Sequence, residues 1–174
     1  LERLRRRIAP FLLRRTKEEV TPELPPKQEQ IIEVELNPLH QRVYAQHLSR
    51  ERQRVLGLVA DLDRNRVEVL SALTRLRQLA IDVSLVDPAN ASVPSSKLEV
   101  LLPLLREAAA EGHRVLVFSQ FTRYLKIISG RLDAEGLAYS YLDGSTLHSA
   151  EVIRDFAEGT QPVFLISLKA GGVG

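Results

Sequence analysis

The sequence predicts an α/β fold in which a parallel sheet is preceded by a basic arm and an α-helical hairpin. In the C-terminal half, short apolar runs alternate with amphipathic segments of helical period, which is typical of a parallel sheet covered by helices. In the middle, apolar residues recur at three- and four-residue steps, as they do on helices. The N-terminal segment is rich first in arginine and then in proline. These three observations divide the chain into residues 1–38, 39–92 and 93–174.

The arm, residues 1–38, concentrates positive charge. Residues 1–17 contain seven Arg or Lys and one acid, whereas the rest of the chain carries a small net negative charge. Such a cluster favours a polyanion or an acidic partner surface, and a solvated helix face is the alternative. Prolines interrupt the second half of the arm, and between them the alternating run QIIEVEL predicts a short strand at 30–36.

Residues 39–92 predict two helices with basic flanks. Arginines outnumber acids in this segment, and residues 83–94 predict a loop. The expected apolar stripes consist of Leu39, Val43, Leu48, Val69, Leu73, Leu76 and Ala80.

Residues 93–174 predict three strands and three helices. The sequence SKLE at 96–99 matches a capping box, so we expect a helix to begin there, to run to about Ala110 and to end at Gly112. Apolar runs predict strands at 114–118, 138–142 and 162–167. The helices between the strands carry Leu125, Ile128 and Leu132 in one case, and in the other Val152, Ile153 and Phe156, before Gly159.

The carboxyl ends of parallel strands share one edge of a sheet, where ligands bind in such folds. We therefore expect SQFT (119–122), DGST (143–146) and SLKAGGVG (167–174) to lie together. Small residues let backbone N–H groups approach an anion, hydroxyl groups can donate hydrogen bonds, and Lys169 adds positive charge. Together these segments predict a phosphate-rich ligand. Taken singly, DGST and KAGGVG could be plain turns, and SQFT could be only an N-cap at Thr122.

Other chemistries find little support in the sequence. The chain has no cysteine, which excludes disulfides and thiolate metal sites, and its four histidines lack metal-ligand spacing. The glycine-rich segment is no P-loop, and neither a Gly-x-Ser-x-Gly elbow nor a positioned carboxylate pair occurs. No apolar run could span a bilayer and no secretory signal is visible. We expect no metal site, no membrane partner, and a cytoplasmic, nucleoid-associated location.

Several segments in order resemble the SWI/SNF-type DNA translocases of the superfamily-two helicases. SSKLEVLLPLLREAAAEGHRVLVFSQFT, YLDGST, VIRDFAEG and PVFLISLKAGGVG resemble the second RecA-like lobe of that family. APFLLRRTKEEV followed by ELPPK resembles the interlobe linker, and LTRLRQLA resembles the end of the helical protrusion. The resemblance implies a linker at 1–38, a protrusion at 39–92 and a partial C-terminal RecA-like lobe at 93–174. It also implies an ATP-driven motor that moves on double-stranded DNA and remodels protein–DNA complexes.

The resemblance also implies roles for particular residues. Gly171, Gly172 and Gly174 would couple DNA contact to the ATP cleft, and Arg14 and Arg15 would position the lobes. The sequence departs from the family at Leu147-His148-Ser149, where relatives often carry a basic residue that contacts phosphate. The residues expected to contact DNA phosphates are Ser119, Gln120, Gly144, Ser145, Thr146, Ser167 and Lys169.

The family's Walker A lysine and Mg²⁺-binding motif would precede residue 1, and its arginine finger would follow Gly174. We therefore expect a longer parent polypeptide that carries the first lobe and uses ATP and Mg²⁺, with no catalytic residue in 1–174 and no ATP bound or hydrolysed by these residues alone. The missing initiator methionine agrees with a longer parent. An unpaired sheet edge predicts self-association.

Two further expectations concern class and source. The alternative to a motor segment is a non-catalytic DNA- or protein-binding module built on the basic arm and the hairpin. Arginine far outnumbers lysine, which favours a bacterial source with a GC-rich genome.

Overall fold

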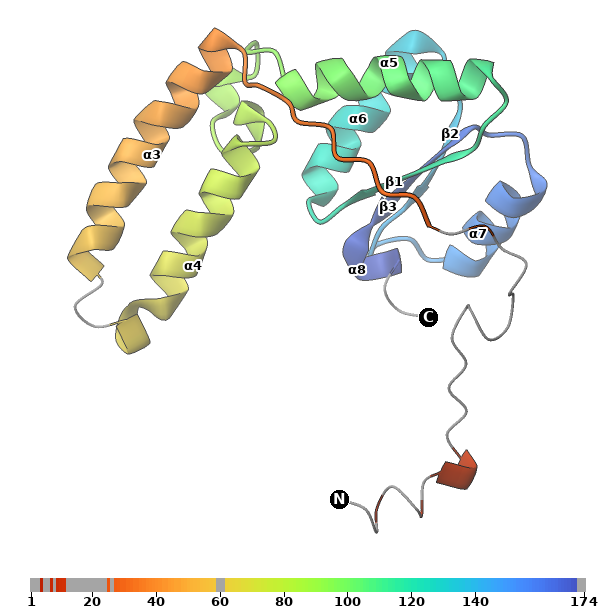
Figure 1. Ribbon diagram of the computed structural model, residues 1–174, viewed down its shortest axis with the longest axis horizontal. Coiled ribbons are helices and arrows are strands. Elements are labelled where there is room, and N and C mark those ends of the chain that lie inside the picture. Colours follow the sequence, from red (N-terminus) through yellow and green to blue (C-terminus); the bar gives the residue numbers. More distant parts are fainter. Residues whose placement is uncertain are drawn as a thin grey trace. The chain divides into compact units, whose positions relative to one another are not determined.

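The computed structural model describes residues 4, 7, 9–11, 25, 27–58 and 62–171. Its contacts divide the chain into two units, Leu1–Glu33 and Val34–Gly174. The first unit contains a short 3-10 helix, η1 (Ala9–Phe11). The second unit contains a helical hairpin and a sheet covered by helices (Figure 1). The division at 38 and 92 stays a prediction.

The sheet confirms the predicted α/β class. Its strands β1 (Val115–Ser119), β2 (Tyr139–Leu142) and β3 (Val163–Ser167) are all parallel and lie in the order β1-β3-β2. The central strand β3 is buried along its whole length, as its continuous apolar sequence VFLIS requires. The three strands begin within one residue of the sequence-based boundaries, because each apolar run is closed by turn-forming residues.

Alternate residues of β3 build the two apolar layers of the lobe. Val163 and Leu165 pack against α5 (Ser96–Ala110) and α6 (Thr122–Glu135). Phe164 and Ile166 pack on the other face, against Val152 and Phe156 of α7 (Ser149–Glu158). The period-two alternation of strand side chains therefore assigns the helices to the two faces of the sheet.

Glycines end the two longer helices of the lobe. Gly112 and Gly136 adopt left-handed φ angles of 78° and 69°. After Gly112 the N–H of His113 donates to Ala108 O at 2.8 Å, and after Gly136 the N–H of Leu137 donates to Leu132 O at 3.0 Å. This 6→1 pattern satisfies helix-end carbonyl groups and confirms the predicted stop of α5.

The predicted capping box at 96–99 is wrong. The N-cap of α5 is Ser95, which makes no side-chain capping bond and donates its hydroxyl proton to Ile81 O at 3.0 Å. Ser96 Oγ instead accepts a hydrogen bond from the Asn37 N–H at 2.8 Å. Both hydroxyls therefore bind segments that are distant in sequence, which a local pattern does not reveal.

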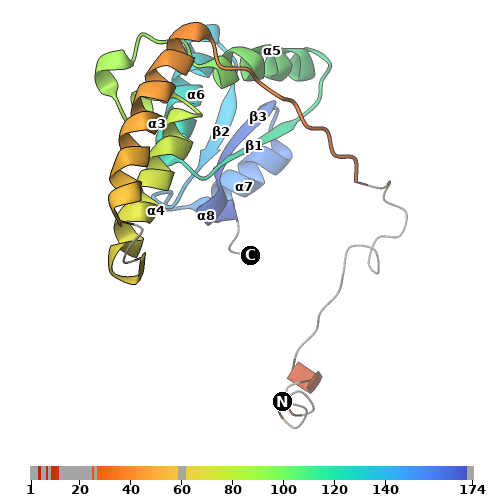
Figure 2. The same ribbon diagram turned by 60° about the vertical axis from the view of Figure 1, so that its left-hand side comes forward.

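Helices α3 (Pro38–Leu58) and α4 (Leu62–Leu79) form the predicted hairpin and lie side by side (Figure 2). At its base, the fully buried His40 makes a hydrogen bond from Nε2 to Leu79 O at 2.6 Å. Ala72 and Leu79 are buried, whereas Leu39, Leu48 and Leu73, which belonged to the expected stripes, are exposed. Each helix of the hairpin packs against the other along one line of contact, which we call the seam. Fewer of its apolar residues are therefore buried than the expected stripes contain.

Three local expectations need correction. Residues 30–36 form no strand, since a strand needs a hydrogen-bonded neighbour and the described strands pair only with one another. The loop at 83–94 contains two short 3-10 helices, η3 (Val83–Leu85) and η4 (Pro88–Asn90). The glycine-rich segment after β3 begins as a helical turn, α8 (Leu168–Gly171). Among the described residues, no helix is long and apolar enough to cross a membrane, and none of their His, Asp and Glu side chains form a metal-binding group.

Candidate nucleic-acid interface

The three predicted segments leave the sheet at one level. Ser119 at the end of β1 pairs with Ser167 at the end of β3, and Leu142 at the end of β2 pairs with Ile166. Because all three strands are parallel, their carboxyl ends meet along one edge, which we call the carboxyl edge. It consists of the ends of the three strands and the turns that follow them, residues 119–122, 143–147 and 167–171.

Asp143 organises the turn after β2. Its side chain is buried, and Oδ1 accepts hydrogen bonds from the Ser145 N–H at 2.8 Å and the Ser145 hydroxyl at 2.6 Å. Oδ2 accepts a hydrogen bond from the Tyr141 hydroxyl at 3.0 Å, and the Asp143 N–H donates to Thr146 Oγ1 at 3.0 Å. These bonds close an Asx-turn whose backbone is held by its own side chains.

The same contacts shift two pKa values in opposite directions. The hydrogen bonds from Ser145, side chain first and then backbone, lower the pKa of Asp143 because they stabilise the carboxylate. Burial, followed by the adjacent Asp143 carboxylate, raises the pKa of Tyr141 to about 12. At neutral pH the turn therefore contains a carboxylate whose charge is dispersed over three donors. Sequence reasoning did not assign Asp143 a role, although an Asp in a turn commonly accepts a hydrogen bond from the backbone N–H two residues on.

Gly144 is exposed at the tip of this turn. Its φ lies outside the left-handed region, and a Cβ atom added there would meet nothing within 4 Å. Neither backbone strain nor crowding within the described residues therefore requires a glycine at this position. Its N–H has no acceptor among the described residues. The turn thus presents a bare backbone donor that a large anion can approach closely.

The turn after β1 joins the edge to the hairpin. Ser119 Oγ accepts a hydrogen bond from the Phe121 N–H at 3.1 Å, and α6 begins at Thr122 with Phe121 as its N-cap, so the alternative of an N-cap at Thr122 is wrong. Gln120 is exposed, and its Oε1 accepts a hydrogen bond from Arg77 Nη2 of α4 at 2.8 Å. The Nε2 group of Gln120 has no acceptor among the described residues.

The segment after β3 contains one buried and one exposed candidate. Ser167 is only 2% exposed, and its Oγ accepts a hydrogen bond from the Ala170 N–H at 3.2 Å. In this structure Ser167 therefore shapes the entry into α8 and does not reach the surface. Lys169 is exposed on α8. Gly171 ends this helix, while Gly172, Gly174, Arg14 and Arg15 lie outside the described residues.

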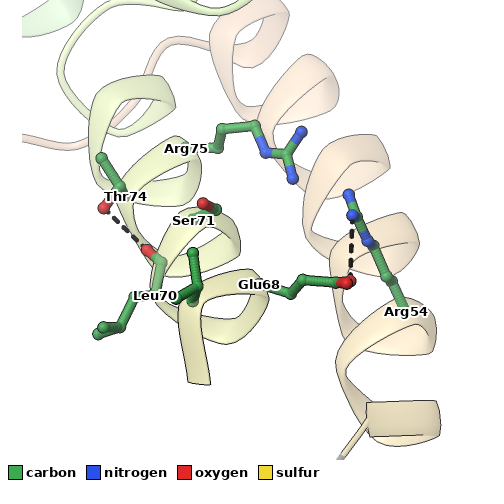
Figure 3. Close-up of a pocket in the computed structure, with 7 residues that line it drawn as sticks. Arg54, Glu68, Leu70, Ser71, Thr74 and Arg75 are labelled. Atoms are coloured by element: carbon green, nitrogen blue, oxygen red, sulfur yellow. Dashed lines mark hydrogen bonds and ion pairs between the residues drawn. The ribbon is translucent and has the colours of Figure 1, made fainter. Parts of the chain in front are cut away.

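A separate hollow of about 600 Å³ lies on the hairpin (Figure 3). Its charged groups are engaged within the hairpin: Arg54 Nη2 lies 3.4 Å from Glu68 Oε2, and Arg75 Nε lies 3.2 Å from the buried Glu51 Oε1. None of the residues expected to contact DNA lines it. The lining consists of Arg54, Val67, Glu68, Leu70, Ser71, Thr74 and Arg75.

The fold is that of a helicase C-terminal domain, and comparisons with known proteins agree. Residues 96–174 match the helicase conserved C-terminal domain, and residues 1–85 match the SNF2-related domain. Because the two matches follow one another along the same chain, the chain belongs to the SWI/SNF-type branch of the superfamily-two helicases.

Curated relatives share part of the chain. The mouse chromodomain-helicase-DNA-binding protein 1-like is 37% identical over 136 residues, which are 67% of this chain and 15% of that protein. The Arabidopsis thaliana chromatin-remodeling ATPase INO80 is 38% identical over 91 residues, which are 51% of this chain and 6% of that protein. The chain therefore spans a small part of the length of these relatives.

Solved structures share the fold. The Sulfolobus solfataricus SWI2/SNF2 ATPase core in complex with dsDNA superposes with a TM-score of 0.72 at 23% identity, over 95% of this chain and 36% of that one. The C-terminal part of the Fun30 ATPase domain superposes with a TM-score of 0.65 at 22% identity, over 87% of this chain and 72% of that one. The sheet and its helices are thus RecA-like, as the resemblance implied. The expected bacterial source gains no support, since the curated relatives named here are eukaryotic.

Proposed function

We propose that the chain is part of an ATP-dependent motor that moves along double-stranded DNA and remodels protein–DNA complexes, and that its carboxyl edge contacts DNA phosphates. Family membership supports the motor class, and the names of relatives such as the chromatin-remodeling ATPase INO80 support ATP use. A structural neighbour described as a complex with dsDNA supports the choice of polymer. This proposal places the parent protein on DNA inside the cell.

Gly144 carries the DNA part of the proposal. The described fold has room for a Cβ atom at Gly144, and yet the position has no side chain at the tip of a hydrogen-bonded turn. A phosphate that approaches the bare Gly144 N–H explains this choice, because a Cβ would stand in its way.

The structure narrows the set of expected phosphate contacts. We assign direct contacts to the Gly144 N–H, to Gln120 Nε2, to Lys169 Nζ and to the Thr146 hydroxyl, which accepts from Asp143 and still has a proton to donate. Ser119, Ser145 and Ser167 shape the turns, because the hydroxyls of Ser119 and Ser145 donate to Phe121 O and Asp143 Oδ1, and Ser167 is buried. The dispersed charge of the Asp143 carboxylate reduces its repulsion of a phosphate.

ATP supplies the energy for movement when it is bound between the two lobes of the parent. Of the glycines expected near the cleft, the structure describes only Gly171, at the end of α8 directly after the carboxyl edge. We assign to α8 the role of joining the DNA-facing Lys169 to this glycine. Residues 1–174 are expected to hydrolyse no ATP alone, since the Mg²⁺ site and the arginine finger are supplied by other parts of the family's motor. DNA-stimulated ATP turnover by purified residues 1–174 would contradict this.

The salt dependence of DNA binding tests the proposal. The affinity for a fluorescent duplex should fall with salt on a log–log plot with a slope of about −0.9 per neutralised phosphate, and Lys169→Ala should make the slope shallower by about one. Arg131→Ala, which removes the same charge near the C-terminal end of α6, is the matched control and should leave the slope unchanged. A wild-type chain with no salt-dependent binding would refute the DNA-contact proposal and favour a protein-docking module.

A further inference from the structure

Arg77 connects the hairpin to the carboxyl edge. It lies in the last turn of α4, and its Nη2 donates to Gln120 Oε1 at 2.8 Å, across 43 positions of the sequence. Both residues are exposed. Among the side-chain hydrogen bonds of the described residues, this one joins α4 directly to the turn after β1.

The hydrogen bond fixes which end of the Gln120 amide faces outward. A guanidinium group only donates hydrogen bonds, so that the amide must present its oxygen to Arg77. The Nε2 group, with its two protons, is then directed away from Arg77. A glutamine without this partner rotates about its last side-chain torsion and presents either end, and the oxygen end repels a phosphate.

The hairpin does not need this bond to stay in place. Its base is held by the buried bond from His40 to Leu79 O at 2.6 Å, and the segment that follows is held by Ser95 to Ile81 O at 3.0 Å and by Arg123 to Leu85 O at 2.9 Å. An exposed side-chain bond adds little to stability beside such contacts. Stability alone therefore does not explain why Arg77 pairs with Gln120, which carries the one side-chain amide of the carboxyl edge.

We infer that Arg77 is a positioning residue for DNA binding, which orients Gln120 so that Nε2 donates to a DNA phosphate. The inference rests on the proposed function. It gives α4 a role in DNA binding. The residues that the sequence analysis expected to contact DNA all lie at the ends of the strands of the sheet or in the turns that follow them, and none of them lies in α4. The inference also predicts that Arg77 acts only through Gln120.

A double-mutant cycle on the complete 174-residue chain tests the inference, with a fluorescent duplex of fixed sequence as the probe. Arg77→Met should raise the Kd about three- to tenfold when Gln120 is present, as expected for the loss of one well-oriented hydrogen bond. In the Gln120→Ala background the same change should raise the Kd less than about twofold, since its target is gone. Arg52→Met removes an exposed arginine of α3 and should leave the Kd close to that of wild type.

Three outcomes would overturn the inference. Equal effects of Arg77→Met in both backgrounds, or no effect in either, would show that Arg77 does not act through Gln120. A salt slope that becomes shallower by about one on Arg77→Met in the Gln120→Ala background would show that Arg77 itself binds a phosphate. These results leave the proposed function standing, whereas a wild-type chain that does not bind DNA refutes both.

A second variant keeps the test decisive if Arg77→Met fails to fold. Gln120→Glu keeps an acceptor for Arg77 and even strengthens the pair, but it offers no donor to a phosphate. Its Kd should rise at least as much as that of Gln120→Ala, with an unchanged melting temperature. Binding at the wild-type level by Gln120→Glu would contradict the assigned orientation.

Discussion

Gly144→Ala separates the needs of the fold from those of ligand binding. A Cβ added at Gly144 meets no atom within 4 Å and φ is not left-handed, so the substitution introduces neither a clash nor backbone strain. Removing a glycine also restricts the unfolded chain, which raises the free energy of unfolding by about 0.4–1 kcal/mol. The variant is therefore expected to be as stable as wild type, or slightly more stable. A methyl group beside the N–H should nevertheless hinder a phosphate and raise the Kd for duplex DNA about tenfold, the equivalent of one hydrogen bond of about 1.4 kcal/mol.

Gly136→Ala is the matched control with the opposite pattern. Gly136 has a φ of 69° and also has open space around it, so that only backbone strain opposes a side chain there. A left-handed alanine should lower the free energy of unfolding by about 1 kcal/mol and the melting temperature by about 2–4 °C. Gly136 ends α6, away from the carboxyl edge, and the Kd should not change.

Urea denaturation and fluorescence anisotropy with labelled duplex DNA measure the two quantities on the same preparations. A phosphate contact at Gly144 is refuted if Gly144→Ala binds DNA as tightly as wild type, because the Gly144 N–H would then have no phosphate partner. A loss of stability in Gly144→Ala like that of Gly136→Ala would equally refute the assignment of this glycine to ligand binding, since the glycine would then serve the fold.

Three further predictions concern stability and titration. In urea denaturation, Arg75→Met should lower the free energy of unfolding by about 3 kcal/mol, because it leaves the Glu51 carboxylate, whose side chain is 8% exposed, without its cation. Arg54→Met, which breaks a half-exposed ion pair, should lower the free energy of unfolding by less than about 1 kcal/mol, and equal losses for the two variants would contradict the prediction. A spectrophotometric titration should show a tyrosine transition with a midpoint of about 12 that disappears in Tyr141→Phe, and the absence of this transition in wild type would argue against burial of the hydroxyl beside Asp143. Because the pKa of Tyr141 is raised in the fold, the free energy of unfolding should fall as the pH rises from about 10 towards 12. Asp143→Asn should lower the free energy of unfolding by about 1–3 kcal/mol at neutral pH. Because the pKa of Asp143 is lowered in the fold, the difference in stability between the variant and wild type should vanish as the pH falls through that pKa. A difference in stability that persists in acid would point to a cause other than the carboxylate.

Local sequence patterns were sufficient for the sheet and for the C-terminal end of α5. The run VFLIS has no polar residue, which predicts a central strand, and β3 is buried throughout. Gly112 follows the last residues of an amphipathic segment, and it ends α5 with a left-handed φ. These features depend on residues a few positions apart, so that a single sequence contains the necessary information.

Patterns that depend on distant partners were interpreted incorrectly or missed. Ser96 was expected to cap its own helix, but its Oγ accepts from Asn37, 59 positions away. The alternation at 30–36 predicted a strand, but none of the described strands forms a ladder with it. Leu73 was placed in the buried stripe of α4, but the seam of the hairpin runs past Ala72.

The sequence by itself determined the α/β class, the parallel sheet and the three segments that meet at its carboxyl edge, because hydrophobic period and turn-forming residues act over short distances. The tertiary structure alone decided which groups at that edge face outward. The fold engages the Ser145 hydroxyl with Asp143, buries Ser167, leaves the Gly144 N–H without an acceptor among the described residues, and brings Arg77 from the hairpin to Gln120. The partner of Gln120 lies 43 positions away in the chain, and only the packed fold brings these two residues together.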